Sequence, residues 1–247
     1  MLWLTIGVLL VVLVLYFIAE SARKTTLTML KGANAVRELP FPVGDGFVAA
    51  YRQADAWAVE HGYHRREIVH FSLVSEEDLV RTHGHADPDG SPWWVKSAFW
   101  WHPEKRCVYS ITEAEGKVFH DFDTAFGREP GRPEYELTTS NHPDGAVVPR
   151  PPRFPAQVFP GKGAGELEAL HEKASHWIRE QTGLEPLEPG DTLAHVRRHL
   201  RVHAEHTLAH PLWHLRFYLW HLSKGRRLNR PVRELYQGRI PGESHKA

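Results

Sequence analysis

The sequence predicts an α+β fold in which an N-terminal transmembrane helix is followed by an antiparallel β-meander covered by helices. Three observations predict it. Residues 2–19 are apolar and carry no charge, residues 67–140 form short alternating runs separated by turn residues, and residues 165–222 repeat apolar residues at helical spacing. Short strands that follow one another through tight turns pair antiparallel, whereas a period near 3.6 residues indicates helices.

Residues 2–19 predict one membrane-spanning helix, within an anchor at 1–22. Eighteen helical residues reach roughly 27 Å, close to the thickness of the hydrocarbon core of a bilayer. Basic residues follow the apolar run, at Arg23 and Lys24, and none precedes it. The positive-inside rule then predicts a single-pass membrane protein with its soluble domain in the cytoplasm and lipid as the partner of residues 2–19. A signal peptide cleaved near Ala19 and a buried core helix are the alternatives.

The remaining length predicts one main domain. A linker at 23–46 leads to the α+β domain at 47–240, which is long enough for one good core, and a tail follows at 241–247. Lys plus Arg and Asp plus Glu number 30 each, so no basic excess indicates a nucleic-acid partner. Cys107 is the only cysteine, which excludes an intrachain disulfide and agrees with a reducing compartment.

The sheet is expected at about 67–140, after an amphipathic helix at 47–63 that ends at a glycine. Its candidate strands alternate apolar with polar or aromatic residues, and they lie at 67–74, 93–101, 106–112, 117–126 and 134–140. These runs predict a four- or five-stranded sheet with one apolar face that needs cover.

A proline-rich segment at 147–161 separates the expected sheet from the helices. Its five prolines exclude a helix or a central strand, so we expect it to cross the surface in an extended form. Helices are then expected at 165–182, 191–210 and 211–222, and they provide the cover for the sheet. The last of these is rich in aromatic residues and has a basic flank, which indicates either membrane-surface contact through 211–222 or an aromatic core helix.

Histidines repeat along the second of these helices. Spacings of four, four, three, four and four residues connect His195, His199, His203, His206, His210 and His214. Such spacings place all six within about 100° of arc on one helix face. Two imidazoles one turn apart can share a divalent transition metal, so the candidate metal ligands are His195, His199, His203 and His206. A solvated polar face in a histidine-rich chain and a pH-dependent partner contact are the alternatives.

The aromatic strand at 93–101 predicts a second kind of site. A large aromatic sheet face under helices can enclose an apolar cavity, and Trp93, Phe99 and Tyr109 are its candidate lining residues. If aromatic side chains fill the core completely, an interaction surface remains instead.

No motif identifies a reaction. The H-x-H-x-D run at 83–87 resembles the start of the metallo-β-lactamase signature, but Pro88 stands where the next histidine should be. The glycine-rich loop at 161–165 lacks the spacing of a P-loop. The sequence therefore favours a membrane-anchored ligand-binding or interaction module over an enzyme. The alternative is a metal-dependent enzyme, or a pH or metal sensor, that uses the histidine ladder at 195–214.

Overall fold

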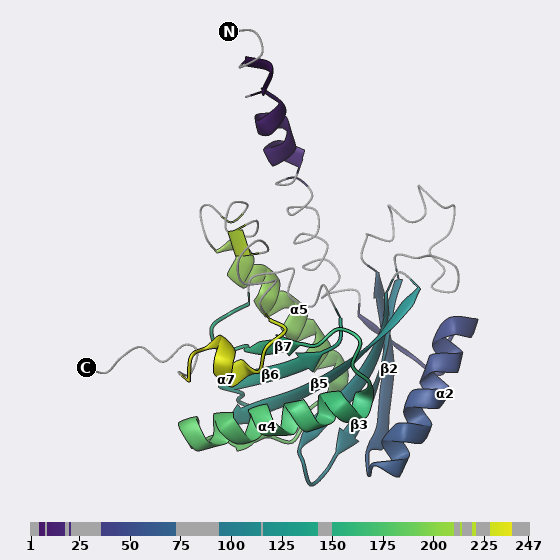
Figure 1. The fold of residues 1–247 in the computed structure, drawn as a ribbon. Helices are drawn as coiled ribbons and strands as arrows, with labels where there is room; N and C mark the ends of the chain where they lie inside the picture. Colours follow the sequence, from purple (N-terminus) through teal and green to yellow (C-terminus); the bar gives the residue numbers. More distant parts are fainter. Residues whose placement is uncertain are drawn as a thin grey trace.

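An α+β domain built on one mixed eight-stranded sheet forms the centre of the molecule (Figure 1). The computed structural model describes residues 5–7, 9–17, 20, 36–72, 94–114, 116–142, 150–209, 213, 219–220 and 228–238. Its strands are β1 (Arg37–Leu39), β2 (His64–Ser72), β3 (Trp94–His102), β4 (Cys107–Ala114), β5 (Lys117–Gly127), β6 (Tyr135–Ser140), β7 (Ala156–Val158) and β8 (Glu185–Pro186). Its helices are α2 (Asp45–Glu60), α4 (Ala164–Thr182), α5 (Thr192–Leu208) and α7 (Val232–Leu235).

The predicted antiparallel meander is wrong for the sheet as a whole, because the sheet is mixed and has eight strands. Strands β1 to β6 pair antiparallel in sequence order, but β7 pairs in parallel with β6, through Thr138 and Ala156. Strand β7 comes from the proline-rich segment expected at the surface. It has three residues and lies at an edge, where a strand needs hydrogen bonds on one side only and prolines beside it are tolerated.

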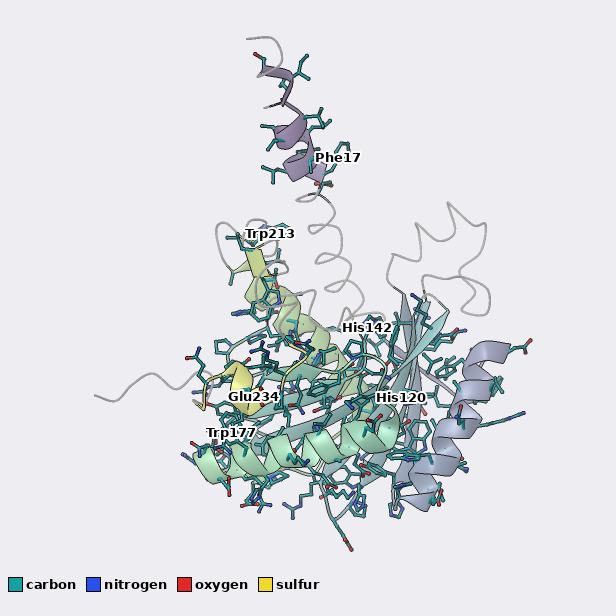
Figure 2. The ribbon with its side chains drawn as sticks, viewed as in Figure 1. Phe17, His120, His142, Trp177, Trp213 and Glu234 are labelled. Carbon is teal, nitrogen blue, oxygen red and sulfur yellow. The ribbon has the colours of Figure 1, made fainter. Side chains whose placement is uncertain are left out.

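The predicted transmembrane helix is not supported, and the membrane part of the predicted fold is corrected accordingly. Within the described ranges, no helix is both long enough and apolar enough to cross a bilayer. A helical stretch is described at 9–17. Its side chains are exposed, as Figure 2 shows for Phe17.

Helices α2 and α4 cover one face of the sheet with an aromatic core. Tyr109 of β4 pairs with Trp100 of β3 on one side and with Phe122 of β5 on the other. Its ring centroid lies 5.3 Å from that of Trp100 and 5.0 Å from that of Phe122. All three side chains are fully buried, and Leu167 of α4 joins them. Burial of each such side chain contributes about 2–3 kcal/mol to folding, so this face holds much of the stability of the domain.

Helix α5 covers the opposite face, for which no cover was expected from the sequence (Figure 1). One side of α5 is apolar and places Leu193, Val196 and Leu200 against a small core that includes Val69 and Phe99. The other side carries histidines and lies over β5 and β6. Asp191 starts the helix, because its side chain accepts a hydrogen bond from the backbone N–H of Ala194 at 2.7 Å; such a cap satisfies a free donor of the first turn.

Candidate functional site

Ionisable side chains gather between α5 and the sheet, and we call this group the α5 cluster. Strand alternation puts Asp121 and Asp123 of β5 on the face that α5 covers, and Ala125 on that face pairs with Glu136 of β6. The cluster consists of Asp121, Asp123, Glu136, Arg150, His195, Arg198, His199 and His203. Carboxyl groups on two strands therefore face the histidines of one helix.

Glu136 is the best-paired carboxylate of the cluster, and its side chain is 1% exposed. It accepts a hydrogen bond from His199 Nδ1 at 3.3 Å, forms an ion pair with Arg198, and lies 3.5 Å from His195 Nε2. Burial acts to raise the pKa of Glu136. The hydrogen bond from His199 and the nearby positive charges outweigh burial and lower the pKa to about 2. Glu136 is therefore an ionised anchor for α5.

Asp121 and Asp123 are less well compensated. Burial, together with the charge of Asp123, raises the pKa of Asp121 to about 7, although Ser140 and Arg150 oppose the shift. Burial also raises the pKa of Asp123, whose Oδ1 accepts a hydrogen bond from Thr138 Oγ1 at 2.6 Å. Within the part of the chain that the structure describes, neither aspartate lies within ion-pair distance of a Lys or Arg. The cluster thus holds two carboxyl groups whose pKa burial raises.

His203 is a buried histidine of the cluster, and its side chain is neutral. It is 3% exposed, its ring centroid lies 4.4 Å from that of His199 and 5.5 Å from that of Phe154, and its Nε2 has no hydrogen-bond partner among the described residues. Burial lowers its pKa well below the usual value, and the charges of His199 and Arg150 act in the same direction.

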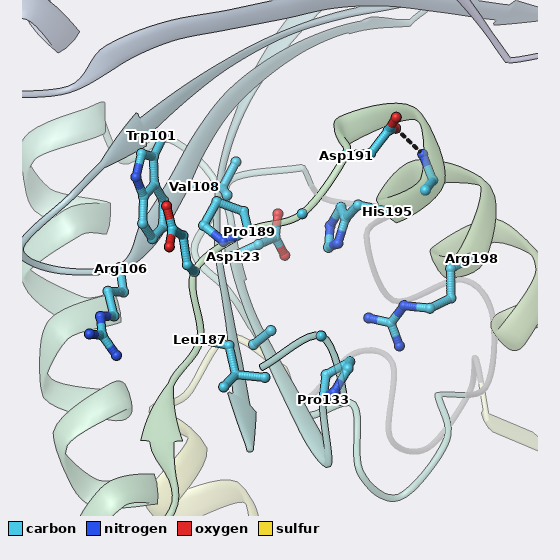
Figure 3. Close-up of a pocket in the computed structure, with 15 residues that line it drawn as sticks. Trp101, Arg106, Val108, Asp123, Pro133, Leu187, Pro189, Asp191, His195 and Arg198 are labelled. Atoms are coloured by element: carbon cyan, nitrogen blue, oxygen red, sulfur yellow. Dashed lines mark hydrogen bonds between the residues drawn. The ribbon is translucent and has the colours of Figure 1, made fainter. Parts of the chain in front are cut away.

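A pocket of about 210 Å³ opens beside the N-terminal end of α5 and reaches the cluster. In Figure 3, the Asp123 carboxylate and the His195 ring face each other across it, and the Arg198 guanidinium points into the same space. The remaining wall is largely apolar and comes from β3, β4 and two loops: Trp101, Val108, Pro133, Leu187 and Pro189. An apolar pocket with a few converging polar groups at one end is the usual form of a small-ligand site.

The predicted metal ligands His195, His199, His203 and His206 lie together on α5. His195, His199 and His203 turn toward the sheet rather than into solvent, and His206 is half-buried one turn further on. No group of three or more His, Cys, Asp or Glu side chains among the described residues could hold a metal ion. Two of them, His195 and His199, contact the Glu136 carboxylate.

The predicted cavity residues do not meet. In the β3–β4 pairing, Phe99 lies opposite Ser110 while Trp100 lies opposite Tyr109, so Phe99 and Tyr109 are on different faces of the sheet. Phe99 packs under α5, and Tyr109 belongs to the core under α2 and α4. Trp93, the 83–87 run and most of 211–222 lie outside the described residues. The pocket beside α5 is lined by other residues altogether.

The carboxylates of the site were not among the predicted site residues. The signal for them is the position of Asp121 and Asp123 on either side of Phe122 in one strand, next to a strand that carries Glu136 on its polar face. A polar strand face is commonly solvated. A histidine face on a later helix is the feature that could have indicated a buried partner for these acids.

A second polar group lies on the opposite face, beneath α4, and its role is structural. His171 is fully buried between two hydroxyl groups, with Nε2 2.8 Å from Thr124 Oγ1 and Nδ1 2.9 Å from Thr139 Oγ1. Burial lowers the pKa of His171 to about 3, so its ring is neutral. Burial also raises the pKa of the Cys107 thiol, which leaves it a small buried side chain rather than a nucleophile.

The chain matches no protein-family model, and neither a characterised protein nor a solved structure is similar to it.

Proposed function

We propose that the protein is a small-molecule-binding module and that its ligand occupies the pocket beside α5. The observation that carries the proposal is the convergence of Asp123, His195 and Arg198 at the inner end of a largely apolar pocket. Charged groups that line an apolar concavity, with a pKa raised by burial in one of them, are typical of ligand-binding and active sites.

The surrounding structure would hold these groups in place for a ligand. Asp123 is on a central strand and accepts a hydrogen bond from Thr138 on the neighbouring strand. Arg198 is positioned by its ion pair with Glu136, and His195 is one helical turn before His199, which also contacts Glu136. Polar groups that are held by regular elements and by a second layer of partners are well suited to specific binding.

The pocket wall contains an exposed residue at which the proposal can be tested. Ala194 of α5 lines the pocket, and a tryptophan there would fill the entrance without displacing a core side chain. Ala49 is exposed on α2, which covers the other face of the sheet, so Ala49→Trp is the matched control.

The experiment is a screen of small neutral, cationic and anionic fragments against the full chain by ligand-observed NMR. We expect some fragments to bind the wild-type chain and Ala49→Trp, and to lose binding to Ala194→Trp while its circular dichroism spectrum is unchanged. A screen in which no bound fragment is sensitive to Ala194→Trp would contradict the proposal.

A second candidate function is pH sensing, which is supported by the contact of His195 and His199 with the Glu136 carboxylate. A protonated imidazole binds a carboxylate more strongly than a neutral one, so α5 should open more often at higher pH. Amide hydrogen exchange along α5, measured at about pH 5.5 and 7.5, would show this change. The double variant His195→Gln, His199→Gln should reduce the pH dependence, and an unchanged dependence would count against this candidate.

A further inference from the structure

The α5 cluster contains more carboxyl groups than permanent positive charges. Three carboxyl groups, from Asp121, Asp123 and Glu136, face the two guanidinium groups of Arg150 and Arg198. The charge of Arg198 is already matched by Glu136, with which it forms an ion pair. When all three carboxyl groups are ionised and the imidazoles are neutral, one negative charge is left over.

Asp123 is the group that would present this negative charge to the pocket, because a bound cation favours the ionised form of a carboxyl group whose pKa burial raises. It is the only member of the three that lines the pocket wall. Within the described residues its single hydrogen bond comes from the neutral Thr138 hydroxyl, and it forms no ion pair. A carboxylate removed from bulk water gains most from a positively charged partner, so a cation that entered the pocket would supply the missing contact.

The rest of the pocket fits a cation that carries a small apolar body. Trp101 forms part of the wall, and indole rings attract cations. Leu187 and Val108 supply apolar surface, while Glu188 and Asp191 add acidic groups around the space. Arg106 also lines the pocket, but it is exposed and donates to the backbone oxygen of Pro186 at 3.0 Å.

We infer that the ligand of this pocket is a small organic ammonium ion, whose charged nitrogen contacts Asp123 and whose apolar body packs against Trp101 and Leu187. The inference rests on the proposed function, since it names the ligand class of the same pocket. A dry cavity of about 150 Å³ is enough for benzene, so the 210 Å³ here admits one aromatic ring with an aminomethyl group.

The test compares three probes that share a ring and differ in charge: benzylamine, benzyl alcohol and benzoate. Each is titrated against the full chain at neutral pH and followed by NMR. We expect benzylamine to bind about tenfold more tightly than benzyl alcohol, and benzoate to bind most weakly. Asp123→Asn should remove the preference for benzylamine while it changes the affinity for benzyl alcohol by less than about twofold. Glu60→Gln, an exposed acid at the end of α2, is the charge-matched control and should keep the preference.

The outcomes separate this inference from the proposed function. Equal binding of benzylamine and benzyl alcohol, or tighter binding of benzoate, would overturn the ammonium inference. If Ala194→Trp blocks the binding of these probes, the pocket is still a ligand site. Benzylamine binding that survives Ala194→Trp would also overturn the inference, because the amine would then bind elsewhere. Failure of all three probes to bind overturns it as well, while the wider fragment screen decides separately whether the pocket binds any small molecule.

Discussion

Glu136 of β6 accepts a hydrogen bond from His199 of α5 at 3.3 Å, and this contact, with the ion pair to Arg198, joins α5 to the sheet. The carboxylate is almost completely buried, so its partners replace nearly all of its hydration. Removal of its charge leaves two basic groups without their anion inside the protein. The stability of the domain should therefore depend on this one side chain.

We expect Glu136→Gln to lower the free energy of unfolding by about 2 kcal/mol at pH 7. Breaking a fully buried ion pair costs about 3–5 kcal/mol, and the lower figure reflects the partial exposure of Arg198. Urea denaturation followed by circular dichroism measures the change. Glu129→Gln, which breaks an exposed ion pair with Arg132, is the control and should cost less than about 0.5 kcal/mol. Equal effects of the two substitutions would show that the buried carboxylate does not anchor α5.

The effect of Glu136→Gln should also depend on pH in a defined direction. The pKa of Glu136 is lowered to about 2 in the folded chain, whereas an unfolded glutamate titrates near its usual value of 4.5. Its contribution is therefore complete above pH 4.5 and is lost as pH falls from 4.5 toward 2. Denaturation curves at several pH values should show the wild-type advantage shrinking over that interval. A constant difference across the interval would contradict the lowered pKa.

Asp121→Asn should stabilise the protein at alkaline pH. Burial raises the pKa of Asp121 to about 7, so the folded chain holds its proton more tightly than the unfolded chain does. Stability is consequently lost as pH rises from about 4 to 7, and an uncharged amide of the same shape avoids that loss. We expect the variant to exceed the wild type by roughly 2 kcal/mol at pH 8 and to match it near pH 4. A variant less stable than the wild type at pH 8 would contradict the raised pKa of Asp121.

His203→Leu should stabilise the domain by about 1 kcal/mol, because it removes a buried imidazole nitrogen that has no partner among the described residues. The pKa of His203 is lowered well below its usual value, so the wild type loses stability as pH falls below about 6.5, where the unfolded histidine takes up a proton. The gain from the leucine should therefore be larger at pH 5 than at pH 8. Thermal unfolding at both pH values tests this, with His176→Leu on the exposed surface of α4 as the control.

The sequence was sufficient to predict the α+β class and the histidine face of α5, because both depend on local periodicity. It did not predict which sheet face α5 would cover, because that depends on packing between residues far apart in the chain. Cover was expected only for the apolar face of the sheet, which does not carry the acids of β5. Edge strands of two or three residues, such as β7 and β8, carry too little periodicity to be recognised.

The separation of Phe99 from Tyr109 could have been derived from the sequence. A four-residue turn between 101 and 106 pairs residue 99 with residue 108, which already places 109 on the opposite face. The structure has the same parity, with His102 opposite Cys107 at the end of the hairpin. The pocket beside α5 could not be derived in this way, because its walls come from three strands, a helix and three loops.

Gly127 at the end of β5 should be one of the least replaceable residues around the pocket. A Cβ atom there would lie 2.5 Å from the backbone oxygen of Arg132 and 3.0 Å from Leu187, which lines the pocket. Backbone atoms cannot move aside as the end of a flexible side chain can, so Gly127→Ala should lower the free energy of unfolding by about 1–3 kcal/mol. It should also weaken ligand binding, because it shifts the 187–191 segment. Gly165, in the first turn of α4, meets nothing within 4 Å, and Gly165→Ala should instead stabilise the domain by up to about 1 kcal/mol. Chemical denaturation of both variants compares the two effects, and a neutral Gly127→Ala would show that the loop adjusts freely beside the pocket.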